Sequence, residues 1–171
     1  KRTIPSNNEK AMSVISDFDQ ALSSAYRQLR ELLATFRLTI QEADLHEALN
    51  QLIVPLQGQT TASIQIHCAL SSQSLNAQQQ VHALQIVREA VLNAIKHANA
   101  TLITVNCDSA PNGNNMIIIT DNGTGIKSLD EPEGHYGLNI MSERASRLGG
   151  TLNIHRREEG GTSVCLLFPQ Q

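Results

Sequence analysis

The spacing of apolar positions divides the chain into a long helical segment and a following mixture of helices and strands. Between residues 9 and 38, apolar side chains recur at steps of three and four, the period of an amphipathic helix. They include Ile15, Phe18, Leu22, Tyr26, Leu29, Leu33 and Phe36. A single helix of roughly 40 Å with an apolar stripe along one face needs a second helix or a domain surface to bury that stripe. The pattern therefore favours half of a helical hairpin that dimerises as a bundle over a helix packed on its own domain.

The pattern changes after a hinge at residues 39–44. Asp44 and Gly58 predict the two ends of a helix over 45–57, and a capping-box pattern at Asn76 and Gln79 starts a helix over 77–98. Further segments predict strands at 61–70, 101–108, 115–121, 151–158 and 162–168, and a helix at 138–148. This order predicts an α/β fold, a two-layer sandwich of a mixed sheet and helices, rather than alternating βαβ units.

Composition narrows the possible partners. Hydrophobic residues make up 40% of the 171 positions but aromatic residues only 3%, so the core must be aliphatic. A net charge of -3 gives no general attraction to nucleic acid or to an anionic membrane. No apolar run approaches the roughly 18–20 residues that span a bilayer. The chain starts at Lys1 without Met, so we expect a fragment that makes no membrane contact itself.

The three cysteines are far apart and form no CxxC pair, which argues against a zinc site. Cys68, Cys107 and Cys165 each lie in an apolar, strand-like run. We therefore interpret them as buried small hydrophobic residues in a reducing compartment rather than as disulfide partners.

One polar stripe marks the predicted helix at 77–98. In REAVLNAIKHA, Glu89, Asn93 and His97 follow one another at steps of four, with Lys96 beside them. A carboxylate, an amide oxygen, an imidazole and an ammonium on one face can hold hydrated Mg²⁺ and phosphate oxygens. Taken alone, the stripe is better explained as a solvated helix face.

A second feature ends the predicted strand at 115–121. Asp121 is followed by Gly123 and Gly125, whose missing Cβ atoms let backbone and ligand come close. The carboxylate only accepts hydrogen bonds, so a flat base with an exocyclic amine would satisfy it. A hairpin turn is the alternative. A calcium loop is excluded, because its acidic ligand pattern is missing.

Two glycine motifs complete the set. Gly134 and Gly137, in GHYGL, precede a helix N-terminus, where backbone N–H groups and the helix dipole suit phosphate. The pair before Thr162, in GGT, is by itself best explained as a hairpin turn.

Together, in this order, REAVLNAIKHA, DNGTGI, GHYGL and GGT resemble the ATP-binding domain of sensor histidine kinases, within the group that includes gyrase B, Hsp90 and MutL. The spacing fits as well, with 28 residues from Asn93 to Asp121 and 16 more to Gly137. The resemblance covers residues 42–169 and implies a Bergerat-type ATP-binding fold.

KHANA and HYGLNIMSERASRLGGTL are typical of the nitrate/nitrite-responsive subfamily. The resemblance implies that Asp121 binds the adenine amine with help from Thr162, that Asn93 ligates Mg²⁺, and that Glu89 assists at the γ-phosphate or the metal. It also implies phosphate contacts for Lys96 and His97. The remaining nucleotide-binding or lid positions that it implies are Gly123, Gly125, Ile126, Gly134, Tyr136, Gly137, Leu138.

The sequence departs from the family at the phosphate acceptor. Kinases of this family phosphorylate a histidine on a helical hairpin, and His46, in DLHEAL, follows the long helix instead of preceding it. We therefore divide the chain into 1–41, a partial dimerisation and phosphotransfer helix with its hinge, and 42–171, the catalytic domain. This fragment should bind ATP without phosphorylating itself.

The resemblance also implies partners that this chain lacks. They are the acceptor-histidine hairpin, a response regulator that receives the phosphate on an aspartate, and a second copy of the full-length protein. The implied location is the cytoplasmic portion of a bacterial inner-membrane receptor. Two alternatives stay open: an ATP-driven clamp or ATPase of the same fold, and a degenerate module that binds no nucleotide, which predicts loss of Asn93 or Asp121.

Overall fold

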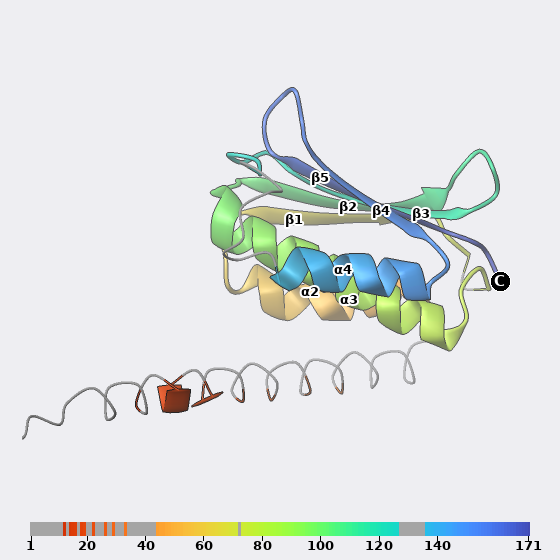
Figure 1. Ribbon diagram of the computed structural model, residues 1–171. Helices are drawn as coiled ribbons and strands as arrows, with labels where there is room; N and C mark the ends of the chain where they lie inside the picture. The colour runs from red at the N-terminus through yellow and green to blue at the C-terminus, as the bar shows by residue number, and fades with distance from the viewer. Residues whose placement is uncertain are drawn as a thin grey trace, which may run out of the picture. The chain divides into compact units, whose positions relative to one another are not determined.

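A computed structural model describes residues 12, 14–16, 18, 19, 22, 26, 29, 33, 44–71, 73–126 and 136–171 (Figure 1). The chain forms two compact units, residues 1–34 and 35–171, and each is considered by itself. The described residues of the first unit are helical, and their apolar side chains, such as Phe18 and Leu22, are exposed. Most of the range 9–38 lies outside the described residues, so its single long helix stays a prediction, as does the domain boundary at 41/42.

The second unit contains a five-stranded mixed sheet, as the sequence pattern predicted. The spatial order is β1-β2-β3-β5-β4; β1 and β2 run parallel and the other neighbours are antiparallel. The strands are β1 Ser63–Cys68, β2 Leu102–Ser109, β3 Asn115–Asp121, β4 Thr151–Arg156 and β5 Thr162–Phe168. The predicted strands at 115–121 and 162–168 have these bounds, whereas 61–70 and 151–158 were too long.

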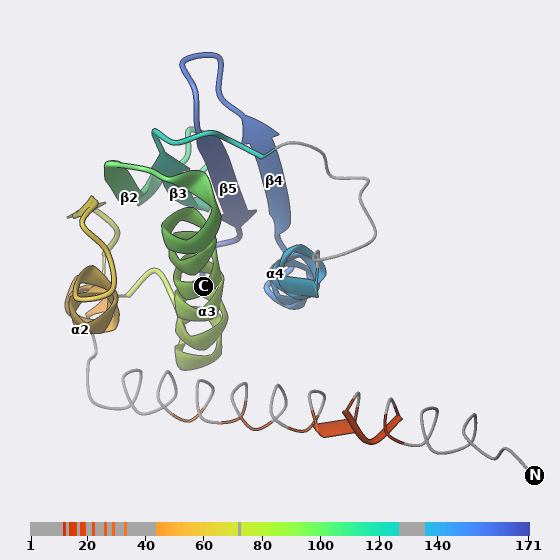
Figure 2. The same ribbon diagram turned by 90° about the vertical axis from the view of Figure 1, so that its left-hand side faces the viewer.

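Within the described part of this unit, three α-helices lie on one face of the sheet, which confirms the two-layer sandwich (Figure 2). They are α2 Leu45–Gln57, α3 Ala77–Asn93 and α4 Tyr136–Arg147. The predicted caps are present: the Asp44 carboxylate accepts from the His46 N–H at 2.9 Å, and Asn76 and Gln79 form a reciprocal capping box. Among the described residues, no helix is long and apolar enough to span a membrane.

An aliphatic core fills the space between the two layers. Alternate residues of the central strands point toward the helices, because side chains along a strand alternate between its two faces. The fully buried members include Leu49, Leu84, Val91, Ile103, Val105, Ile117, Met141, Leu166 and Phe168. Phe168 is the largest of them, and the other named members are aliphatic, so mainly aliphatic packing positions β3, the central strand that ends at Asp121.

The helix predicted over 77–98 ends differently. α3 stops at Asn93, and a π-helical turn, η1 (Ala94–Ala98), continues the segment until Asn99 adopts a left-handed conformation with φ of 50°. Short π-helical turns are uncommon and often occur at functional sites. The α-helical period assumed from the sequence therefore holds from Glu89 to Asn93, and His97 lies in the π-helical turn beyond it.

Candidate functional site

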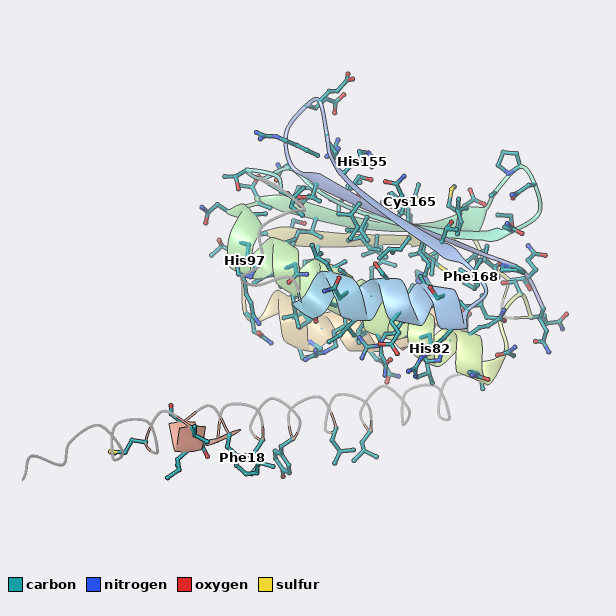
Figure 3. All side chains as sticks on the ribbon, viewed as in Figure 1. Phe18, His82, His97, His155, Cys165 and Phe168 are labelled. Carbon is teal, nitrogen blue, oxygen red and sulfur yellow. The ribbon has the colours of Figure 1, made fainter. Side chains whose placement is uncertain are left out.

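The helical wall of the site is built by α3. Glu89 and Asn93 are half-buried and one helical turn apart, while Val87 and Val91 on the opposite side are fully buried in the core. Lys96 and His97 lie in η1 and are exposed. Figure 3 shows His97 at the C-terminal end of this helical segment. The structure thus supports a half-buried oxygen pair at Glu89 and Asn93, with two exposed basic side chains beyond it.

The end of η1 lies against the loop that follows β3. The Thr124 N–H donates to the Ala98 carbonyl oxygen at 2.7 Å, and a Cβ at Gly123 would collide with the same oxygen. Gly123 is therefore needed for a close approach of two backbone segments. This contact joins the REAVLNAIKHA and DNGTGI motifs, which the sequence could relate only by resemblance.

Asp121 ends β3 and is only 5% exposed. The Gly123 N–H donates to its Oδ1 at 2.8 Å, and the Thr162 N–H donates to its Oδ2 at 3.1 Å. Each oxygen has a second lone pair, so the carboxylate can accept further hydrogen bonds while these two hold its orientation. The carboxylate is thus fixed by backbone on both sides.

The glycine pair between β4 and β5 forms more than a hairpin turn. Gly160 and Gly161 have φ of 95° and 86°, in the left-handed region that favours glycine. A Cβ at Gly161 would also overlap the carbonyl oxygen of Asp121. The missing side chain therefore lets the hairpin come close enough for Thr162 to reach the carboxylate.

Arg157 holds the same corner from the β4–β5 hairpin. Its Nη1 donates to the Asp121 carbonyl oxygen at 2.9 Å, and its Nη2 donates to Glu159 Oε2 at 3.0 Å. Sequence reasoning missed Arg157, because only the pairing of β4 with β5 brings it to Asp121. It did single out Gly161 as part of GGT, but taken alone it explained the glycine pair as a hairpin turn.

The second glycine of DNGTGI also has a local cause. Gly125 has φ of 73°, and a Cβ there would lie 2.8 Å from the Gly161 carbonyl oxygen and 3.1 Å from Arg156 Cγ. Ile126, the next residue, is half-buried. Close packing of the loop after β3 against the β4–β5 hairpin therefore requires glycine at position 125.

The GHYGL motif meets Glu89. Gly137 is the second residue of α4, and a Cβ there would collide with Glu89 Oε1. Leu138 packs against the core. Tyr136 begins α4, but its side chain and all of Gly134 lie outside the described residues. The four motifs are thus brought together, although no described contact joins Lys96 or His97 to the others.

The donor atoms of the helical wall suit a hard cation that retains water. Among the described residues, no group of three or more His, Cys, Asp or Glu side chains gathers as a metal cluster. A Glu carboxylate and an Asn amide oxygen, half-buried beside a glycine, are nevertheless oxygen ligands of the kind that Mg²⁺ prefers when water and phosphate complete its shell.

Comparison with known proteins gives concordant results. The sequence model of the family described as "Histidine kinase-, DNA gyrase B-, and HSP90-like ATPase" matches residues 78–171. The nitrate/nitrite sensor protein NarQ of Escherichia coli (strain K12) is 58% identical over 98% of this chain and 30% of its own length. NarX of the same strain is 35% identical over 94% of this chain and 27% of its own length.

A solved structure shows the same fold. The blue-light activated histidine kinase of Erythrobacter litoralis EL346 superposes with a TM-score of 0.71 at 22% identity, covering 85% of this chain and 49% of that one. The chain spans less than a third of the length of the two curated sensor proteins.

Proposed function

Because this chain belongs to the family of histidine kinase-, DNA gyrase B- and HSP90-like ATPases, we propose that it binds ATP with Mg²⁺ and donates the γ-phosphate to a histidine. The acceptor lies on a dimerisation hairpin outside this chain. The observation that carries the proposal is the buried Asp121 carboxylate, which two backbone N–H groups hold in one orientation. Such a carboxylate is suited to an exocyclic amine.

We call Asp121, Gly123, Gly161 and Thr162 the adenine wall. On this proposal, Asp121 accepts a hydrogen bond from the adenine amine, and the Thr162 hydroxyl helps through a water molecule. Two donors already fix the carboxylate, so little conformational freedom is lost on binding. Ile126 and Leu138 add apolar contacts to the nucleotide, as does Tyr136.

We call Glu89, Asn93 and Gly137 the phosphate wall. Asn93 ligates Mg²⁺, and Glu89 orients the γ-phosphate or the metal. Bound Mg²⁺ would neutralise charge on the phosphate oxygens. Lys96 and His97 face the phosphates from the π-helical turn, where both are exposed and have room to move. Gly125, Gly134 and Gly137 belong to a lid that closes over the nucleotide.

The relatives' names extend the proposal to a pathway. NarQ and NarX are both named nitrate/nitrite sensor proteins, so we infer that the parent protein takes part in nitrate or nitrite signalling. Residues 42–171 then form the catalytic domain in the cytoplasmic portion of a membrane receptor, and residues 1–41 contribute to the dimerisation hairpin. The phosphate passes from histidine to an aspartate of a response regulator.

Nucleotide titration is the first test of this proposal. ATP with Mg²⁺ is titrated into the wild-type chain and into Asn93→Ala and Asp121→Ala. We expect saturable binding that either substitution weakens by about 10-fold or more. A wild-type chain that binds no nucleotide contradicts the proposal and supports a degenerate interaction module.

A transfer assay separates a kinase from an ATPase. The chain is mixed with a separate dimeric protein that carries a NarQ-type acceptor hairpin and with γ-labelled ATP. Acid-labile label on the acceptor histidine supports the proposal. Free phosphate alone, with no label on the hairpin, instead supports an ATP-driven clamp or ATPase.

A further inference from the structure

Cys68 and Cys107 are direct partners in the parallel ladder between β1 and β2. Neighbouring strands lie roughly 4.8 Å apart, and a disulfide accommodates Cα separations of about 4.4–6.8 Å. Because direct partners in a parallel ladder point the same way, the two side chains are on the same face of the sheet. The backbone therefore presents the two sulfur atoms to one another without a rearrangement of the fold.

The two thiols differ in environment. Cys107 is only 2% exposed, whereas Cys68 is half-buried. Their mutual hydrogen bond lowers the pKa of Cys68, and a backbone hydrogen bond at Leu70 acts in the same direction, against burial and the nearby Asp44 carboxylate. The hydrogen bond and burial raise the pKa of Cys107. Cys68 is thus the better nucleophile and Cys107 the protonated partner.

A cavity gives a reagent access to this pair. It has a volume of about 440 Å³ and is lined by both cysteines together with His46 and His67, among others. Its walls come from the N-terminal end of α2 and the C-terminal parts of β1 and β2. The cavity lies at the C-terminal end of β1. Ser63 is at the other end of this strand, where its N–H donates to the Thr101 carbonyl oxygen beside the DNGTGI loop.

We propose that Cys68 and Cys107 are a reversible dithiol–disulfide pair that reacts with low-molecular-weight disulfides. The Cys68 thiolate attacks one sulfur of the reagent RSSR, which forms Cys68–S–S–R and releases RS⁻. Cys107 passes its proton to a departing RS⁻ and attacks Cys68 Sγ, which forms the Cys68–Cys107 bond and releases the second RS⁻. The two RS⁻ groups leave as two RSH with the two protein protons, so RSSR is reduced as the protein dithiol is oxidised.

The cysteine pair is separate from the proposed nucleotide site. Cys107 pairs with Ile117, four residues before Asp121 on β3, which is about 13 Å along the strand. Cys165 pairs with Ile118, whose side chain is on the opposite face of the sheet from Ile117. Cys165 therefore provides an internal control thiol that has no described partner cysteine.

The test uses the full chain, reduced and then treated with excess oxidised glutathione. Samples are alkylated at intervals, and intact mass and peptide mapping locate each modification. Wild type and Cys165→Ser should both lose two free thiols as a Cys68–Cys107 link forms, and dithiothreitol should restore them. The oxidised chain should also melt at a higher temperature, because the link closes a loop of about 40 residues.

Two single variants test the order of the steps. Cys107→Ser should accumulate a stable glutathione adduct on Cys68, while Cys68→Ser should react at Cys107 at least about 10-fold more slowly because that thiol is buried. A wild-type chain whose Cys68 and Cys107 both stay alkylatable overturns the proposal. So does a glutathione adduct that persists on Cys68 in wild type, and both of these outcomes are independent of how the serine variants fold.

Discussion

The two carboxylates of the proposed nucleotide site, Asp121 and Glu89, are held in different ways. Asp121 is buried and accepts one backbone N–H on each oxygen, while its own carbonyl oxygen is held by Arg157. Glu89 is half-buried and accepts no hydrogen bond from any residue that the structure describes. The adenine wall is therefore built of backbone, and the phosphate wall of side chains on one helix.

This difference fits the chemistry proposed for each wall. Recognition of a flat base depends on one fixed direction of the accepting oxygen, which preorganised backbone donors supply. Mg²⁺ obtains most of its ligands from phosphate oxygens and water, so flexible side chains are sufficient to complete its coordination shell. The comparison predicts that substitutions on the adenine wall affect folding as well as binding, whereas those on the phosphate wall affect binding alone.

The largest effect is expected for Gly161→Ala. The new Cβ would overlap the Asp121 carbonyl and would also require φ of 86°. We expect a loss of about 3 kcal/mol in the free energy of unfolding, or about 10 °C in melting temperature, together with loss of ATP binding. Gly113→Ala is the matched control, because Gly113 has φ of 80° with nothing within 4 Å. It should cost only about 1 kcal/mol, and equal melting temperatures for the two variants would contradict the backbone account.

Gly137→Ala should have the opposite profile. Its Cβ would meet the mobile end of Glu89, and alanine is a better helix former than glycine inside α4. We expect a melting temperature that is unchanged or slightly raised, while ATP–Mg²⁺ affinity falls by about 10-fold because Glu89 is displaced. Calorimetric titration and thermal melting on the same sample measure both. A clear loss of stability would show that the phosphate wall is as rigid as the adenine wall.

Arg157→Met tests how much the side-chain brace adds to the adenine wall. It leaves the Asp121 carbonyl without its guanidinium donor, so we expect a loss of about 1 kcal/mol in stability and a several-fold loss of ATP affinity. Glu159→Gln is the control, since it removes only an ion pair to an 85% exposed carboxylate. If Arg157→Met and Glu159→Gln have the same stability and the same ATP affinity, the hydrogen bond from Arg157 to the Asp121 carbonyl oxygen contributes nothing.

The smallest effect concerns His82, on α3. Burial, aided by Arg147 and Arg144, lowers the pKa of His82 below its ordinary value of 6.5, and its buried Nδ1 has no hydrogen-bond partner among the residues that the structure describes. Below pH 6.5, His82 therefore binds a proton more readily in the unfolded chain than in the folded chain, so the free energy of unfolding falls as the pH drops.

The melting temperature of the wild-type chain should fall as the pH is lowered below 6.5. In His82→Gln this fall should be smaller by about 1 °C, as measured by thermal melts across the same pH range. His155→Gln, at an exposed position on β4 (Figure 3), is the control for replacing a histidine by glutamine as such. Identical pH profiles for His82→Gln and wild type would contradict this assignment. The substitution His82→Gln should not alter ATP affinity at constant pH, because His82 lies near the N-terminal end of α3, away from both walls.

Much of the fold was predictable because its signals are local. The helix over 45–57 has the predicted bounds, since the Asp44 cap and Gly58 act within a few residues of it. The strands at 115–121 and 162–168 were equally clear from uninterrupted apolar runs. The end of α3 was not, because apolar spacing over five residues cannot distinguish an α-helical from a π-helical turn.

The contacts that depend on strand register could not be predicted. The sequence indicated Asp121 and Thr162 by resemblance, but nothing local placed Arg157 or Gly161 against the Asp121 carbonyl. The interpretation of the three cysteines as buried hydrophobic residues was also only partly right. Cys107 is buried, but Cys68 and Cys165 are half-buried, and the pairing of Cys68 with Cys107 arises from the parallel alignment of β1 and β2.

The central claim is that the Asp121 carboxylate recognises an exocyclic amine. The most direct test compares the affinities of ATP and inosine triphosphate, which carries a carbonyl oxygen where ATP has its amine, for wild type and Asp121→Asn. Wild type should prefer ATP by about 10- to 100-fold. In Asp121→Asn that preference should vanish or reverse, because the new amide can donate to a carbonyl. A variant that still binds nucleotide and keeps the wild-type preference would contradict the account.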